Sequence, residues 1–401
     1  MQTEKYHVFD INGQKAYVRK DRLPQLNRVD SVIFDCDGVL VDIRESYNKA
    51  IAQTVSYVLK ALTNSEVPEG LVSNELIHLF RRTGGFNNDW DTVYGILMFV
   101  LSRLPDEKRV ALGNLVTKTD NNHPPFQRLS SVRKAVGKVL QKDCLQESFF
   151  AESVLSLREF TRFLDASGMA SVDKALVEKT VQGKNIKGFC GVLGSFLYLP
   201  AEVGKGIIAT AQEEFFCGAE LFKRTFGVES AFNKGLGMVE NEKVIIQQTT
   251  LEKLASLLGG GKLGIASGSW STPAKYALGN LVKQFKPDAC VFINDAVEAE
   301  RQLLKEKGVT VNLKKPNPFT LVKAAEGLSE PGLVIYVGDS MEDSFMARDA
   351  SKAGRDFVFV GVYLYSGVDD VVRDGFLGAG CDIVIPSVND LPALLEVVRR
   401  G

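Results

Sequence analysis

The hydrophobic pattern of the chain changes character twice, and each stretch predicts a different kind of structure. Near the N-terminus, the segments HVFDI and KAYVR flank Asn12-Gly13, a dipeptide favoured in tight type I′ turns, so we expect a β-hairpin there. The next apolar run, SVIFD, is rich in β-branched residues and is typical of a strand buried on both faces of a parallel sheet. From Arg44 to about Ala61 the apolar residues recur at helical spacing, which predicts a helix.

From this helix to about Val244 the patterns are helical or belong to polar loops, as in LVSNELIHLFRR and VYGILMFVLSRL. After about Ile245, strands and helices alternate. We expect strands at KLGIAS, CVFIND, LVIYVGD, FVFVGVYLY and DIVIP, and helices over residues 251–258, 272–284, 318–326, 343–353 and 389–400. Such alternation predicts right-handed crossovers and a parallel sheet. SVIFD has no partner nearby in sequence, so we place it in this same sheet.

These patterns predict an α/β fold, with a Rossmann-like doubly wound parallel sheet as its core and an inserted, mostly α-helical cap domain. The expected boundaries are residues 1–30 for an N-terminal hairpin extension, 31–44 and 245–401 for the core, and 45–244 for the cap.

Composition narrows the classes of function. The net charge of −1 provides no basic footprint for nucleic acid or an anionic membrane. The longest apolar candidate, residues 189–201, is interrupted by Gly191, Gly194 and Pro200, and the N-terminus lacks a signal-peptide pattern. The six cysteines contain no CxxC pair, which argues against a zinc site or a disulfide scaffold. We therefore expect a cytoplasmic protein.

Acidic residues follow two of the predicted strands. Asp35 and Asp37 come at the end of SVIFD, and Asp339 and Asp343 lie in the segment after LVIYVG. Ligands of open parallel sheets bind beyond the carboxyl ends of the strands, so these groups are expected to meet there. Residues two apart on an extended segment point the same way, and Gly38 allows a sharp turn after them. Clustered carboxylates need a cation, and Mg²⁺ is the usual choice beside phosphate.

A cluster of acids alone would repel a phosphate, and a second group of residues offsets this. Lys315 in KKPNP provides a positive charge, with Lys314 as its rival. The hydroxyl of Ser267 and the N–H groups of Gly268 and Ser269 provide short donors near an expected helix start, which favours anions. A nucleophile, a metal and an anion cradle are the parts that phosphoryl transfer requires.

The segments VIFDCDGVLVD, GIASGS, KKPNP and VIYVGDSMED, in this order, resemble the four motifs of the haloacid dehalogenase superfamily. The resemblance covers residues 32–42 and about 251–386. A large helical insertion after the first motif is similar to the phosphoglycolate-phosphatase-like branch, and TGGFNNDWD resembles a cap sequence of one of its archaeal and plant subgroups.

The resemblance implies a role for each motif residue. Asp35 would be the nucleophile that forms an aspartyl-phosphate, with its other oxygen on Mg²⁺. Asp37 would act as general acid and then as general base, and its backbone carbonyl would touch the metal. Ser267, Gly268 and Lys315 would hold the phosphoryl oxygens. Asp339 would complete the metal site, and Asp343 would ligate or support it.

The expected function is that of a magnesium-dependent phosphatase acting on a small phosphorylated metabolite. Asp37 favours phosphate chemistry over dehalogenation, because a halide leaving group needs no proton. A phosphomutase of the β-phosphoglucomutase type would use the same residues, and a non-catalytic binding protein on this fold is a further alternative. In the cap, a polar loop around Gly84-Gly85 either contacts the substrate or is a surface turn between helices; its candidate contacts are Arg81, Arg82, Asn87 and Asn88.

Overall fold

The structure is a computed structural model that describes residues 2–86, 88–143, 145–180, 186–260, 262–328, 331–352 and 354–400. By its internal contacts the chain divides into two compact units. Unit 1 consists of Met1–Arg44 and Glu242–Gly401, and unit 2 is the intervening segment Glu45–Asn241.

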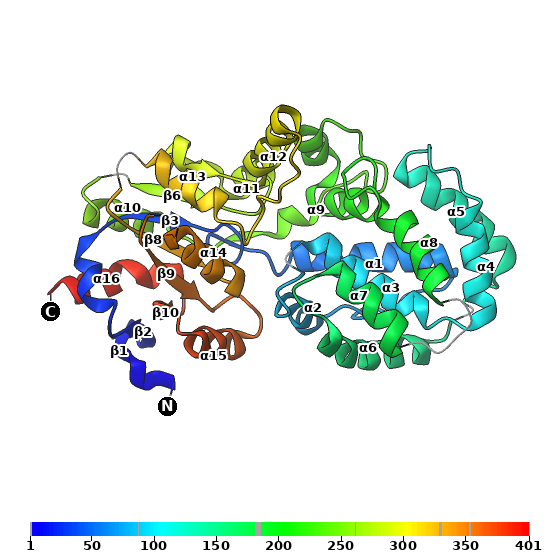
Figure 1. Ribbon diagram of the computed structural model, residues 1–401, viewed down its shortest axis with the longest axis horizontal. Helices are drawn as coiled ribbons and strands as arrows, with labels where there is room; N and C mark the ends of the chain where they lie inside the picture. Colours follow the sequence, from blue (N-terminus) through cyan, green and yellow to red (C-terminus); the bar gives the residue numbers. More distant parts are fainter. Residues whose placement is uncertain are drawn as a thin grey trace. The chain divides into compact units, whose positions relative to one another are not determined.

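Unit 1 is built on a mixed sheet (Figure 1). Its strands are β1 (Tyr6–Ile11), β2 (Gln14–Arg19), β3 (Val29–Phe34), β6 (Leu263–Ala266), β7 (Cys290–Val291), β8 (Leu333–Gly338), β9 (Phe357–Val362) and β10 (Ile383–Ile385). In the described residues these eight strands follow the order β1-β2-β10-β9-β8-β3-β6-β7. Neighbours from β10 to β7 pair in parallel, with β3 between β8 and β6. The predicted α/β fold is confirmed, and SVIFD joins the sheet of the C-terminal strands.

Helices cover both faces of this sheet. They are α10 (Gln248–Leu257), α11 (Ser271–Leu278), α12 (Ile293–Lys307), α13 (Phe319–Gly327), α14 (Met341–Lys352), α15 (Asp369–Ala379) and α16 (Leu391–Arg400), with the short helices η1 (Gln2–Lys5), η2 (Leu23–Arg28), η6 (Gly279–Gln284), η7 (Pro287–Ala289) and η8 (Val388–Asp390). Successive residues of a strand point to opposite faces. On β8, Ile335 and Val337 join the core formed with α10 and α16, whereas Val334 and Tyr336 join the core formed with α13, α14 and α15.

The N-terminal hairpin extends the sheet. Asn12 and Gly13 have φ values of 55° and 78°, as a tight hairpin turn requires. β1 pairs antiparallel with β2, and β2 pairs antiparallel with β10. The hairpin expected around this dipeptide is therefore present, and it adds two antiparallel strands to the edge of the parallel sheet.

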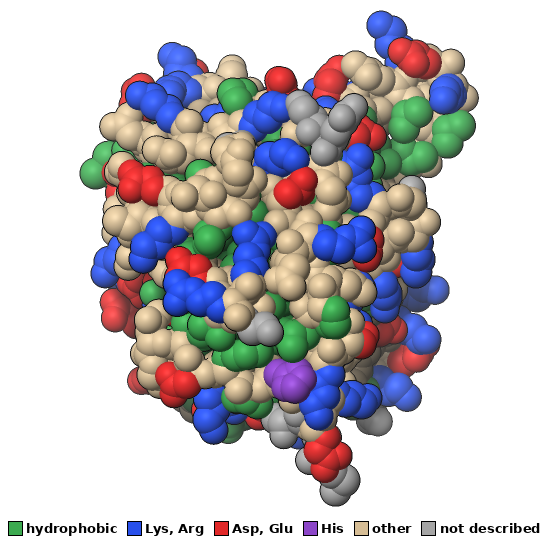
Figure 2. Space-filling view, turned by 90° about the vertical axis from the view of Figure 1, so that its left-hand side faces the viewer, with side chains coloured by type: hydrophobic (Ala, Val, Ile, Leu, Met, Phe, Trp, Pro, Cys, Tyr) green, Lys and Arg blue, Asp and Glu red, His purple; other side chains and the backbone are tan. Residues whose placement is uncertain are grey.

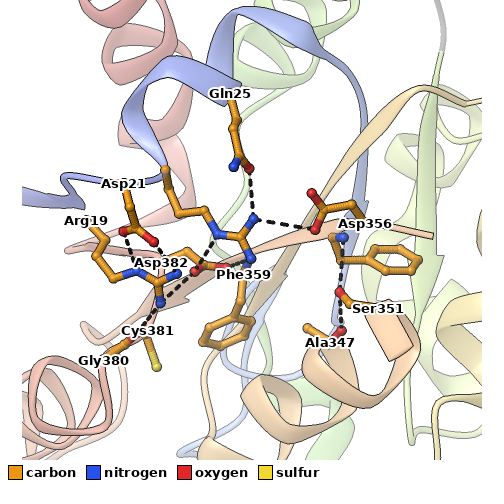
Figure 3. A network of polar contacts seen from close by, with 12 residues as sticks. Arg19, Asp21, Gln25, Ala347, Ser351, Asp356, Phe359, Gly380, Cys381 and Asp382 are labelled. Atoms are coloured by element: carbon orange, nitrogen blue, oxygen red, sulfur yellow. Dashed lines mark hydrogen bonds and ion pairs between the residues drawn. The ribbon is translucent and has the colours of Figure 1, made fainter. Parts of the chain in front are cut away.

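A buried carboxylate anchors this hairpin to the rest of unit 1 (Figure 3). One oxygen of Asp382 lies 3.0 Å from both Arg19 Nη1 and Arg22 Nε, and the other accepts the backbone N–H of Phe359 at 3.0 Å. Arg19 also donates to the carbonyl of Gly380 at 2.7 Å. Residues from the two ends of the sequence thus share one polar network, in which both carboxylate oxygens of Asp382 accept hydrogen bonds.

Two elements of unit 1 are shorter than predicted. The strand expected at CVFIND ends after Val291, because Asp295 accepts the N–H of Phe292 at 3.0 Å and so starts α12 at Ile293. The helix expected over residues 272–284 is α-helical only to Leu278 and 3₁₀ from Gly279, which has φ 54° and ends the α-helical segment.

The elements of unit 2 in the described residues are helices. They are α1 (Tyr47–Thr63), α2 (Asn74–Arg81), α3 (Asp89–Ser102), α4 (Asp106–Thr117), α5 (Pro125–Val139), α6 (Glu147–Phe160), α7 (Met169–Ala175), α8 (Ile186–Tyr198) and α9 (Ile207–Phe226), with η3 (Thr161–Phe163), η4 (Leu176–Thr180) and η5 (Met238–Asn241). α3 packs against α1, α8 and α9 and is buried on all sides from Thr92 to its end. The helical pattern of the insertion is thus explained by a core of its own.

Two further strands, β4 (Val41–Asp42) and β5 (Lys243–Val244), form an antiparallel pair in unit 1 where the chain leaves it and returns. On the side of unit 1 that carries α16 and the hairpin, basic and acidic side chains are interspersed, in keeping with the net charge of −1 (Figure 2). In the part of the chain that the structure describes, every helix is too short or too polar to cross a bilayer.

Candidate active site

The ends of β3 and β8 bring three carboxylates together. Asp35 follows β3 directly, Asp339 follows β8, and Asp343 lies in the first turn of α14. One oxygen from each lies within 4.8 Å of the others. Asp35 and Asp343 are buried, with 6% and 1% of their surfaces exposed. The structure therefore brings these three predicted residues to one edge of the sheet.

Glycines allow the two strand ends to approach this closely. Gly38 has φ 70°, and a Cβ built on it would lie 2.6 Å from Cγ of Asp339 and closer still to its Oδ2. A Cβ on Gly338 would likewise lie 2.6 Å from Cγ of Asp343. Any larger residue at either position would displace a carboxylate of the cluster.

Lys315 connects two of the acids. Its Nζ lies 3.0 Å from Oδ1 of Asp35 and 2.7 Å from Oδ1 of Asp343, and its side chain is about nine-tenths buried. Lys314 is exposed, so the structure places Lys315 and not its rival at the cluster. An ammonium between two buried carboxylates offsets their repulsion, which a desolvated site would otherwise make costly.

The pKa values reflect this pairing. Burial raises the pKa of the Asp35 carboxyl to about 6, although the charge of Lys315 opposes the rise. Burial alone would raise the pKa of Asp343 as well, but the charge and hydrogen bond of Lys315, together with hydrogen bonds from Ser340 and Tyr336, outweigh it and lower that pKa. The two carboxylates outweigh burial at Lys315, whose pKa lies well above its usual range. Lys315 therefore carries its positive charge at neutral pH.

Asp37 has a different environment from Asp35. Its Oδ2 accepts the hydroxyl hydrogen of Ser269 at 2.6 Å, and the Ser269 hydroxyl lies 3.1 Å from that of Ser267. The carboxylate of Asp37 is not one of the three grouped above. Asp35 thus contacts Lys315 within the group of three carboxylates, whereas Asp37 accepts a hydrogen bond from Ser269, and this difference in environment allows the two aspartates separate tasks. Gly268 lies beside the lysine, since a Cβ built on it would be 3.8 Å from Cδ of Lys315.

Two polar groups of the cluster were absent from the sequence prediction. The hydroxyl of Ser340 donates to Oδ2 of Asp343 at 2.6 Å, and that of Tyr336 lies 2.7 Å from Oδ1 of the same carboxylate. Tyr336 is fully buried in the middle of β8. A buried tyrosine hydroxyl usually needs a partner, but nothing in VIYVGD indicates which groups it meets.

The predicted substrate loop lies in unit 2. Arg81 forms an ion pair with Asp89 at 2.9 Å. Asn88 caps α3, with its side-chain oxygen accepting the N–H of Trp90 at 3.0 Å. Arg82 is exposed at the end of α2. Arg81 and Asn88 thus have local structural roles, and Asn87 lies outside the described residues.

Comparison with known proteins adds the following. No protein-family model matches the chain, and no curated protein matches it. The chain shares its fold with a solved protein. That protein is a structural genomics target determined by X-ray crystallography, 17% identical, with a TM-score of 0.60 over 93% of this chain and 100% of the other. The chain is also similar to a phosphatase from Thermococcus thioreducens, at 18% identity and a TM-score of 0.46, over 91% and 98% of the two chains. One fold can serve many activities, so the likeness to the structural genomics target shows the fold and not the chemistry.

The donor set of the site fits a magnesium ion. Mg²⁺ prefers oxygen ligands and is usually held by one or two carboxylates together with water and phosphate oxygens. Asp35, Asp339 and Asp343 present carboxylate oxygens at one place, and Lys315 already neutralises part of their charge. The nitrogen and sulfur ligands that zinc favours are not among the three.

Proposed function

We propose that this chain is a magnesium-dependent phosphatase that hydrolyses a small phosphorylated metabolite through an aspartyl-phosphate on Asp35. The observation that carries the proposal is the position of Lys315, whose ammonium bridges Asp35 and Asp343 beside a third carboxylate, that of Asp339. This set combines a nucleophile, oxygen ligands for a cation and a fixed positive charge, and phosphoryl transfer depends mainly on such positioning and charge neutralisation.

In the first step, an oxygen of Asp35 attacks phosphorus while the bond from phosphorus to the leaving oxygen breaks. Asp37 donates a proton to that oxygen, so the substrate leaves as an alcohol. Ser269 holds the Asp37 carboxyl through its hydroxyl, and Lys315 and the Ser267–Gly268 segment stabilise the phosphoryl oxygens. Bound Mg²⁺, held by Asp35, Asp339, Asp343 and the backbone carbonyl of Asp37, would neutralise charge on the transferring group.

In the second step, Asp37 takes a proton from a water molecule, and the water oxygen attacks phosphorus. The bond between phosphorus and the Asp35 oxygen breaks, which releases inorganic phosphate and restores the Asp35 carboxylate. The same side chain thus serves as acid and then as base. Asp37 is not a member of the group of three carboxylates and accepts a hydrogen bond from Ser269, and both observations support this assignment.

The test is hydrolysis of p-nitrophenyl phosphate by the purified chain with Mg²⁺, and with EDTA in excess. We expect turnover that EDTA abolishes, and a loss of about 10³-fold or more in Asp35→Asn, because the amide is a poor nucleophile. Asp30→Asn is the matched control: Asp30 lies at the start of β3 and pairs with Lys262 at 2.7 Å, away from the carboxyl edge. Full turnover in Asp35→Asn would exclude the proposed nucleophile.

The identity of the acceptor separates a phosphatase from a phosphomutase. Phosphorus NMR of the products from a panel of sugar phosphates and phosphoglycolate should show inorganic phosphate. Formation of an isomeric sugar phosphate with little inorganic phosphate would instead assign the mutase reaction to the same residues.

A further inference from the structure

The hydroxyl of Tyr336 contacts two charged groups of the site, the ammonium of Lys315 and the carboxylate of Asp343. Its oxygen is 3.0 Å from Nζ of Lys315, 2.7 Å from Oδ1 of Asp343 and 3.3 Å from the backbone carbonyl of Ala266. The tyrosine is fully buried on β8. The proposed reaction assigns no task to this residue.

The hydrogen-bonding capacities of these groups fix the direction of each bond. An ammonium has three protons, and in the described residues Nζ of Lys315 has three close oxygens, one each from Asp35, Asp343 and Tyr336. The lysine has no lone pair, so it must donate to the tyrosine oxygen. The single hydroxyl proton is then directed at Asp343, which is the nearer of the two remaining acceptors.

We propose that Tyr336 is a positioning residue that keeps the ammonium of Lys315 beside Asp35 during phosphoryl transfer; this inference rests on the proposed function. Asp35 and Asp343 both attract the ammonium, and Asp343 lies nearer. The tyrosine acts on both sides of this competition. Its oxygen holds one N–H of the lysine, and its proton satisfies Oδ1 of Asp343, which would otherwise draw the lysine more strongly.

A structural requirement alone does not explain this arrangement. A tyrosine that needed only to satisfy its own hydroxyl could donate to Ala266, whose carbonyl is within reach. The observed geometry instead joins a charged donor and a charged acceptor through one hydroxyl, and hydrogen bonds to charged groups are the stronger kind.

The test compares Tyr336→Phe with Tyr6→Phe, using p-nitrophenyl phosphate and Mg²⁺. Tyr6 is a suitable control because it too is buried in unit 1 and donates its hydroxyl, to the carbonyl of Cys381 at 2.9 Å. It lies on β1, which is separated in the sheet from β8, the strand of Tyr336, by β2, β10 and β9. For Tyr336→Phe we expect kcat to fall about tenfold and KM to change less than about twofold, because Ser267 and Gly268 still hold the ground-state phosphate. Inhibition by orthovanadate, which resembles the transition state, should weaken in proportion to kcat. Tyr6→Phe should lower thermal stability and leave kcat unchanged.

The outcomes separate this inference from the proposed function. If the unaltered chain does not hydrolyse the ester, the proposed function fails. If it does, and Tyr336→Phe has an unchanged kcat, or Tyr6→Phe loses as much kcat as Tyr336→Phe, the positioning role is overturned. For the case in which Tyr336→Phe does not fold, the unaltered chain provides the readout: NMR with ¹⁵N-lysine should show a slowly exchanging ammonium with a cross-peak to a tyrosine hydroxyl proton. An absent cross-peak would also overturn the role.

Discussion

Replacing Gly38 by alanine should damage the proposed metal site more than it damages the fold. Gly38 has φ 70°, and an alanine in this left-handed region costs about 1–2 kcal/mol of the free energy of unfolding. The new methyl group would also lie 2.6 Å from Cγ of Asp339, whereas carbon atoms normally approach to about 3.5 Å. The Asp339 carboxylate must therefore move by roughly 0.9 Å, and a displacement of about 1 Å can cost on the order of a hundredfold in rate.

Gly308→Ala is the matched control, because Gly308 has φ 65° and a Cβ there would meet nothing within 4 Å. Urea denaturation should give similar losses of stability for the two variants. Isothermal titration with Mg²⁺ and the rate of p-nitrophenyl phosphate hydrolysis should be unchanged in Gly308→Ala. In Gly38→Ala, Mg²⁺ affinity should fall at least about tenfold and the rate about a hundredfold. Equal Mg²⁺ affinities in the two variants would refute the assignment of Asp339 as a ligand.

Two further predictions concern stability. Asp382→Ala should lower the free energy of unfolding by about 2 kcal/mol in urea denaturation, because Arg19, Arg22 and the N–H of Phe359 lose their shared acceptor. Asp356→Ala removes an exposed partner 3.4 Å from Arg22 and should lower it by less than about 0.5 kcal/mol. Equal losses in the two variants would contradict the anchoring role of Asp382. Burial, reinforced by Arg82 and Arg81, lowers the pKa of His78, so the unfolded chain binds this proton more readily and stability should fall as the pH drops from about 7.5 to 5.5. His78→Gln should flatten that part of the curve of melting temperature against pH, and an unchanged curve in His78→Gln would rule the contribution out.

The residues at the C-terminal ends of the strands could be predicted from the sequence because local patterns mark each of them. Asp35 and Asp339 follow apolar runs that could be recognised as strands, and strand ends of a parallel sheet meet at one edge. The choice of Lys315 over Lys314 depended on the Pro-Asn-Pro segment that follows Lys315. The structure shows the physical difference between the two lysines, since Lys315 is buried among acids and Lys314 is exposed.

Other features depended on contacts that no local pattern reveals. The role of Tyr336 depends on which loops reach the end of β8, and in sequence it is one more aromatic residue in an apolar strand. The early end of β7 depends on Asp295, whose capping bond competes with strand pairing. Asn88, by contrast, is of a type that often caps helices, and its place before an apolar helical stretch could have assigned it that role.

The pairing of the residues that flank the helical insertion bears on how the length of the insertion can vary in evolution. β4 and β5 pair Val41 with Val244, and within unit 2 the side chain of Asn241 donates to the carbonyl of Glu45 at 3.2 Å. The first and last residues of the helical insertion therefore lie next to each other, as do the two strands that flank it. An insertion whose ends are adjacent can be lengthened, shortened or replaced between β4 and β5 without a change in the contacts among Asp35, Lys315 and Asp343.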